Sequence, residues 1–136
     1  MRKLILVRGL PGSGKSTYAK KNYPDSAHYE ADMFFLTDWS EYIYDRNLIS
    51  AAHDWCFGNT AQALKNGHNV VVSNTFCAEW EMEKYFWLAP LVDAKLEIVE
   101  MQTQYESIHN VPDEAVYRMK QRWYNMPEEF NVKVIK

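Results

Sequence analysis

The stretch Gly9-Leu-Pro-Gly-Ser-Gly-Lys-Ser16 satisfies the pattern GxxxxGK[ST] at every required position. An apolar run, Lys3–Arg8, precedes it and is typical of a buried parallel strand. Residues 17–22 can continue as the first turns of a helix. In such a strand–loop–helix unit, Gly12 and Gly14 let successive backbone N–H groups turn inward. Together with the start of the helix, these groups form a cradle for phosphates.

The side chains of this loop predict the chemistry of the site. Lys15 supplies a mobile cation that can reach the β- and γ-phosphates, and the hydroxyl of Ser16 is suited to bind Mg²⁺. The predicted nucleotide-binding residues are Leu10, Pro11, Gly12, Ser13, Gly14, Lys15, Ser16 and Thr17. We therefore expect a nucleoside triphosphate, ATP or GTP, as ligand and Mg²⁺ as cofactor.

Composition limits the alternatives. With 136 residues, 47% of them hydrophobic, the chain is expected to form one domain over residues 1–136. No apolar run approaches the length of a membrane span, and the first strand begins almost at the first residue, so we expect a cytoplasmic protein without a membrane partner. Cys56 and Cys77 are then reduced packing residues. The net charge of −3 counts against a broad nucleic-acid surface, although a local basic groove stays possible.

The rest of the sequence alternates between strand and helix patterns. Further strands are expected at residues 28–31, 69–73, 95–101 and 131–135. Helices are expected at residues 46–66, 79–88 and 112–124, with Gly67 ending the first of these. This alternation predicts an α/β fold of three layers, in which helices flank a parallel sheet. The alternating strand at residues 95–101 is expected at the outside of the sheet, and most Trp and Tyr side chains are expected in the core.

Two strand ends carry polar residues that bear on catalysis. Asp32 follows the second strand, where it can accept the proton of an attacking hydroxyl, or simply cap the next segment. Ser73 and Asn74 end the third strand, where many phosphate-loop proteins carry an acidic residue. Either Asp32 therefore serves both as the base and as the acidic residue at the magnesium ion, or Mg²⁺ is held by Ser16, phosphates and water alone.

Arg118 and Arg122 are the remaining catalytic candidates. They lie four residues apart, so on one helix they point the same way. They could close over the triphosphate and neutralise charge in the transition state. The alternative is that both are ordinary solvated arginines on an exposed helix face.

Several motifs follow one another in a familiar order. They are Arg8–Thr17, Glu30–Phe34, Ala51–Cys56, Val70–Thr75, His109–Pro112, Met119 and Arg122–Tyr124. With them the chain resembles the ATP-binding kinases allied to the 5′-kinase domain of bacteriophage polynucleotide kinase, a group with an AAA-type ATP-binding domain. The resemblance implies a P-loop NTPase fold like that of adenylate kinase, with a small lid between the fourth strand and the last helix. It also implies that Asp32 is the base that accepts the proton of a 5′-hydroxyl.

The chain departs from the family's pattern in the expected lid. Glu106 and Ser107 occupy positions where relatives carry Arg and Asn, and Ser73 stands where an Asp is usual. Three functions stay open. The first is a kinase for a polynucleotide 5′-hydroxyl, and the second is a kinase for a nucleotide, sugar or other small metabolite. The third is an ATP-binding regulatory module with little or no turnover.

Overall fold

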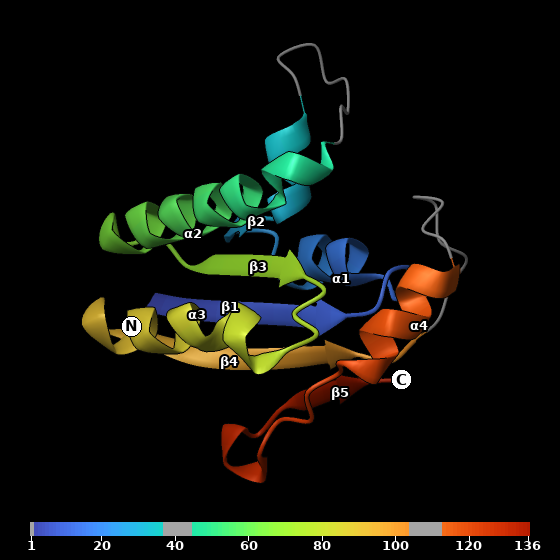
Figure 1. The fold of residues 1–136 in the computed structure, drawn as a ribbon. Coiled ribbons are helices and arrows are strands. Elements are labelled where there is room, and N and C mark those ends of the chain that lie inside the picture. Colours follow the sequence, from blue (N-terminus) through green and yellow to red (C-terminus); the bar gives the residue numbers. More distant parts are fainter. Residues whose placement is uncertain (1, 37–44, 104–112) are drawn as a thin grey trace.

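The computed structural model describes residues 2–36, 45–103 and 113–136, and it places five parallel strands in one sheet (Figure 1). Across the sheet the order is β2-β3-β1-β4-β5. The strands are β1 (Arg2–Gly9), β2 (Ala27–Tyr29), β3 (Val70–Asn74), β4 (Ala94–Met101) and β5 (Lys133–Ile135). The α-helices in the described ranges are α1 (Lys15–Asn22), α2 (Ile49–Lys65), α3 (Glu79–Leu91) and α4 (Asp113–Gln121).

The side chains of β1 alternate between two cores, as strand geometry requires. Leu4 and Leu6 are fully buried in a cluster that includes residues of α2 and α3. Ile5 and Val7 point the other way and pack with Ala19 of α1. Figure 1 accordingly shows α2 and α3 on one face of the sheet and α1 on the other. The predicted three-layer α/β fold is confirmed.

The expected position of β4 at the outside of the sheet is wrong. This strand lies between β1 and β5, and its polar residues Lys95 and Glu97 share a face with Val99. That face is the one that α1 covers, and α1 has only eight residues. Glu97 pairs there with Lys3 at 3.3 Å. The alternation therefore marks a strand that is partly uncovered on one face, and it does not mark a sheet edge.

The second strand is shorter than expected, which changes the setting of Asp32. β2 ends at Tyr29, opposite Val72, and Ala31–Phe35 forms a short 3₁₀ helix. The ladder stops there because the backbone N–H of Ala31 donates to the Asn74 side-chain oxygen at 2.9 Å. Asp32 thus lies in the first turn of a 3₁₀ helix that starts at the carboxyl edge of the sheet.

Helix ends follow local chemistry, but α2 begins at Ile49, after the 3₁₀ turn Arg46–Leu48, and α3 extends beyond its expected end at Leu88. α2 has 17 residues and ends at Lys65, and Gly67 has φ +92, the left-handed conformation that terminates helices. α3 continues to Leu91 although Pro90 lies within it. Pro90 falls in the last turn, so the helix loses little beyond one backbone hydrogen bond there. No helix in the described ranges is long and apolar enough to cross a membrane.

Two tryptophans lie outside the core, against expectation. Trp80 and Trp87 of α3 are 73% and 69% exposed, whereas Tyr85 of the same helix is buried. The three cannot all face the sheet, because residues on one helical face recur every three or four positions. An aromatic side chain in this segment is therefore not by itself a sign of a buried position.

Arg8 is the largest fully buried side chain, and it joins four segments at the carboxyl edge of the sheet. Its Nε and Nη2 donate to the carbonyl oxygen of Phe76 at 3.1 and 2.8 Å, and Nη2 also donates to that of Cys77 at 3.3 Å. Its Nη1 donates to Glu100 at 3.0 Å and to the Tyr124 carbonyl at 2.9 Å. The indole ring of Trp123 covers the guanidinium, with its centre 3.9 Å from the Cζ atom. Every N–H of the guanidinium is used.

We predict that Arg8→Met destabilises the fold by about 3–5 kcal/mol, because it removes the charged partner of Glu100 and the guanidinium donors to the carbonyls of Phe76 and Tyr124. Urea unfolding measures the change. Arg118→Met is the control, since that arginine is exposed and its loss should change stability by less than about 0.5 kcal/mol. Equal stability of the two variants would show that the buried guanidinium has no structural importance.

Candidate nucleotide-binding site

Residues 10–14 connect β1 to α1 in a tight loop. Gly12 and Gly14 have φ +82 and +85, which L side chains adopt only under strain. The backbone N–H of Ser13 donates to the carbonyl of Leu10 at 3.1 Å, closing the turn. Thr103, just beyond β4, donates its hydroxyl to the Ser13 carbonyl at 2.6 Å and so ties the loop to the sheet. The loop has the backbone that its glycines predict.

The start of α1 is open to an anion. The helix begins at Lys15, and within the described residues no side chain caps its N-terminus. The first N–H groups of an α-helix have no carbonyl partner inside the helix, and the helix dipole makes this end positive. The amides of residues 15–17 are therefore suited to bind phosphate oxygens.

Lys15 lies across the mouth of the loop. Its ammonium donates to the carbonyl of Leu10 at 3.1 Å. Burial lowers the pKa of Lys15. The negative charges of Glu30 and Asp32 act to raise this pKa, but burial has the larger effect. A cation held by one carbonyl and attracted by nearby carboxylates can turn to a triphosphate when one enters. Contact of this lysine with phosphate stays a prediction.

Glu30 is the site residue that sequence reasoning missed. It follows β2 directly, and its carboxylate accepts a hydrogen bond from the hydroxyl of Ser16. Burial acts to raise the pKa of Glu30, but hydrogen bonds from His28 and Ser16, together with the charges of His28 and Lys15, outweigh it and hold the pKa below its usual value. The position of Glu30 at a strand end, two residues before Asp32, was the signal that could have identified it.

The oxygen atoms gathered here fit a magnesium ion. Mg²⁺ prefers oxygen ligands, keeps several waters, and is usually held by one or two carboxylates together with substrate phosphates. The hydroxyl of Ser16 and the carboxylates of Glu30 and Asp32 provide oxygens of this kind near Lys15. Ser16 stays the predicted direct ligand.

The charge of Asp32 acts to raise the pKa of Lys15, against the larger effect of burial, so the two groups lie within electrostatic reach. A role for Asp32 as the base stays a prediction. The residue is exposed to solvent, so a substrate hydroxyl can approach it. Asn74 supports this segment from β3, because its side-chain oxygen accepts the N–H of Ala31.

The predicted pair of arginines lies at the C-terminal end of α4, where the backbone N–H of Arg122 donates to the carbonyl of Arg118 at 3.2 Å. α4 ends at Gln121, so Arg122 lies beyond the helix that was expected to reach Tyr124. Arg118 is 71% exposed in its side chain and pairs with Glu114 at 3.7 Å. Arg122 interacts with the thiol of Cys77, where burial raises the pKa of the cysteine and the arginine opposes that rise. A role for either arginine at the triphosphate stays a prediction.

The expected lid lies outside the described residues. Glu106, Ser107, His109 and Pro112 all belong to the range 104–112, which the structure does not describe.

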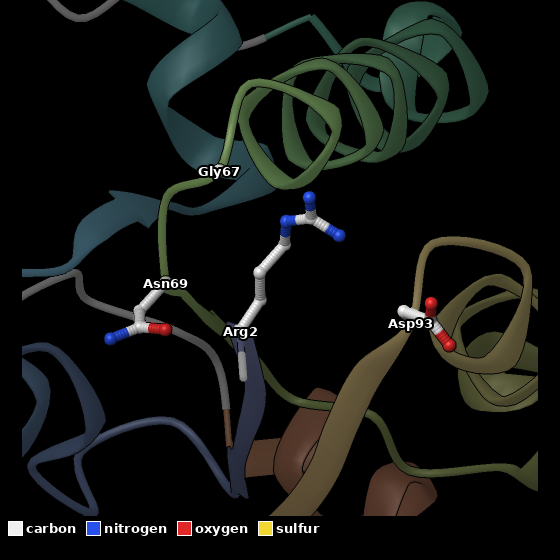
Figure 2. A pocket seen from close by; sticks show the side chains of 4 residues that line it. All are labelled: Arg2, Gly67, Asn69 and Asp93. Atoms are coloured by element: carbon white, nitrogen blue, oxygen red, sulfur yellow. The ribbon is translucent and has the colours of Figure 1, made fainter.

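A surface hollow lies at the other end of the sheet (Figure 2). Its lining residues, Arg2, Gly67, Asn69 and Asp93, stand at or before the starts of β1, β3 and β4. The guanidinium of Arg2 donates to the carbonyl of Val92 at 2.6 Å. Ligands of parallel α/β sheets bind beyond the carboxyl ends of the strands, so this hollow is not part of the candidate site.

Comparisons with known proteins agree with this fold. NEDD4-binding protein 2 of Homo sapiens is 29% identical over 140 residues, which cover 91% of this chain and 8% of that protein. An uncharacterized protein of Pasteurella multocida (strain Pm70) is 30% identical, covering 88% of this chain and 75% of its own length. The chain thus spans only a small part of the human relative.

Solved structures show the same fold at low identity. A Pnkp1/Rnl/Hen1 complex contains a chain with a TM-score of 0.62 and 19% identity, matched over 86% of this chain and 38% of that one. A gluconokinase from Sinorhizobium meliloti 1021 gives a TM-score of 0.66 with 16% identity, over 99% of this chain and 83% of that one. The family described as AAA domain matches residues 4–110. This chain, with its strand–loop–helix unit and parallel sheet, therefore belongs to the AAA domain family of P-loop proteins and has a kinase-like fold.

Proposed function

We propose that the chain is a Mg²⁺-dependent kinase that transfers the γ-phosphate of ATP to a hydroxyl group, with a polynucleotide 5′-hydroxyl as the acceptor. The observation that carries this proposal is the loop of residues 10–14 opening onto the uncapped start of α1. Lys15 and Asp32 interact electrostatically beside it. A phosphate cradle, a cation and a carboxylate are the parts that phosphoryl transfer requires.

The residues would divide the reaction between them. The amides of residues 15–17 and Lys15 bind the β- and γ-phosphates, and Ser16 holds the magnesium ion, which neutralises phosphate charge when bound. Asp32 accepts the proton of the acceptor hydroxyl while the oxygen of that hydroxyl bonds to the γ-phosphorus. The bond from that phosphorus to the bridging oxygen breaks, and ADP leaves. A cytoplasmic setting supplies ATP and Mg²⁺ and agrees with the two free cysteines.

The acceptor is supported by the resemblance of the motifs and by one structural neighbour, an RNA repair complex that contains Pnkp1. A small-molecule acceptor is the second candidate. It is favoured by the net charge of −3 and by the gluconokinase, whose chain is matched over most of its length. The third candidate, an ATP-binding module with little turnover, is favoured by Glu106 and Ser107 at positions where relatives carry Arg and Asn.

Incubation with γ-labelled ATP and a panel of hydroxyl acceptors separates these candidates. We expect label on a 5′-hydroxyl oligonucleotide, and a 5′-phosphorylated oligonucleotide of the same sequence serves as the control. Label on gluconate, another sugar or a nucleoside would instead establish a metabolite kinase. Tight ATP binding with no transfer would favour the regulatory module.

We predict that Lys15→Ala weakens ATP binding by at least about tenfold and abolishes turnover, because a cation that neutralises phosphate charge is lost. Isothermal titration calorimetry measures the affinity. Lys20→Ala is the matched control, since Lys20 is an exposed lysine near the end of the same helix. Unchanged affinity in Lys15→Ala would refute the assignment of the loop.

Replacing Asp32 should separate chemistry from binding. We expect Asp32→Asn to bind ATP normally and to lower the transfer rate by at least ~10²-fold, the contribution typical of a general base. Asp54→Asn, which changes an exposed carboxylate of α2, should transfer phosphate at the normal rate. A near-normal rate in Asp32→Asn would show that this residue is only an acidic side chain in the first turn of the 3₁₀ helix and not the base.

Arg118→Ala and Arg122→Ala test for a cationic clamp. If either arginine stabilises the transition state, its loss should lower kcat by about 10³–10⁵-fold and change the KM for ATP much less. Lys120→Ala, on the same helix, is the control. A loss confined to KM, or no loss at all, would show that neither arginine acts on the transferring phosphate.

A further inference from the structure

The end of β3 lacks the carboxylate that assists the magnesium ion in many phosphate-loop proteins. Ser73 and Asn74 stand there, and both side chains are already engaged. Asn74 accepts the N–H of Ala31, and Ser73 lies 2.9 Å from Nε2 of His28 through its Oγ. Neither residue carries a charge. A carboxylate that assists the ion at this edge of the sheet would therefore come from another strand.

β2 provides such a carboxylate. It pairs with β3 up to Tyr29, which lies opposite Val72, so the residue that follows β2 lies beside the end of β3. That residue is Glu30. Its side chain is only 17% exposed, and it accepts the hydrogen of the Ser16 hydroxyl.

The orientation of Ser16 is the consequence that matters. A hydroxyl has one hydrogen and two acceptor lone pairs. Because the hydrogen of Ser16 is directed to Glu30, the lone pairs of the same oxygen are left for another partner. A cation is such a partner, and the negative charge of Glu30 nearby favours its presence.

Glu30 is itself held in place by its neighbours. Nε2 of His28 lies 3.3 Å from a carboxylate oxygen of Glu30 and 2.9 Å from the hydroxyl of Ser73. Ser73 is buried, with 2% of its surface exposed. The ends of β2 and β3 therefore brace the carboxylate against the loop.

We infer that Glu30 is the positioning carboxylate of the metal site: it turns the hydroxyl of Ser16 toward Mg²⁺ and takes the place of the acidic residue missing from β3. The inference rests on the proposed function, since it concerns the same loop. It adds a specific residue to that function, and it assigns His28 and Ser73 to the support of that residue.

The gain in ATP affinity that Mg²⁺ provides is the quantity that tests this. Titration calorimetry gives the affinity for ATP in Mg²⁺ and in EDTA, and their ratio is the gain. For Glu30→Gln we expect the gain to fall by about 10–100-fold, the loss typical when a partner of a metal ligand is removed. Affinity in EDTA should stay equal or improve, because a negative charge near the phosphates has gone.

A second readout reports on the metal alone. Mn²⁺ can be titrated into the ADP complex and followed by electron paramagnetic resonance, and Glu30→Gln should bind it more weakly than the natural protein. Glu97→Gln is the matched control, because Glu97 is a partly exposed carboxylate that pairs with Lys3 on the sheet. Ser73→Ala should reduce the gain less than Glu30→Gln does, since it acts only through His28.

The outcomes distinguish the inference from the proposed function. If the natural protein does not bind ATP, both fail. If the natural protein binds ATP more tightly in Mg²⁺ and Glu30→Gln shows the same increase in affinity, only the inference fails. If Glu30→Gln lost the same factor of ATP affinity in Mg²⁺ and in EDTA, the inference would also be overturned, because Glu30 would then support the loop and not the metal. Should Glu30→Gln not fold, Glu30→Asp provides the same comparison, with a partial loss of the gain expected.

Discussion

The guanidinium of Arg8 binds the carbonyls of Phe76 and Cys77 before α3, the carboxylate of Glu100 on β4 and the carbonyl of Tyr124 after α4. A buried arginine would be costly without these partners, because charge is strongly disfavoured away from water. With all its donors used, the same group holds three segments at fixed positions relative to β1. Since Arg8 immediately precedes the phosphate loop, the position of the loop in the sheet depends on this interaction.

The candidate site is built on the carboxyl edge that Arg8 organises. β1 leads into the loop and α1, and β2 leads to Glu30 and Asp32. β3 provides Ser73 and Asn74, which brace the end of β2, and the segment after β4 provides Thr103, which holds the loop. Each neighbouring strand thus adds one part. Such an arrangement suits phosphoryl transfer, in which positioning and charge neutralisation provide most of the catalysis.

Family membership does not identify the acceptor. The AAA domain match covers residues 4–110, a range that contains the phosphate loop and Asp32. Structural neighbours that include a gluconokinase and a Pnkp1 complex have similar folds, so the shared sheet does not distinguish a sugar from a polynucleotide. The acceptor therefore has to be identified by direct assay.

The sequence alone determined the features that depend on neighbouring residues. The phosphate loop, the glycine that ends α2 and the α/β alternation could be predicted, because backbone preferences and hydrophobic periodicity act over a few positions. Tertiary structure decided the rest. The inner position of β4, the five bonds of Arg8 and the contact of Glu30 with Ser16 join residues that are distant in sequence. Strand order and pairing place these residues together, and no local pattern carries that information.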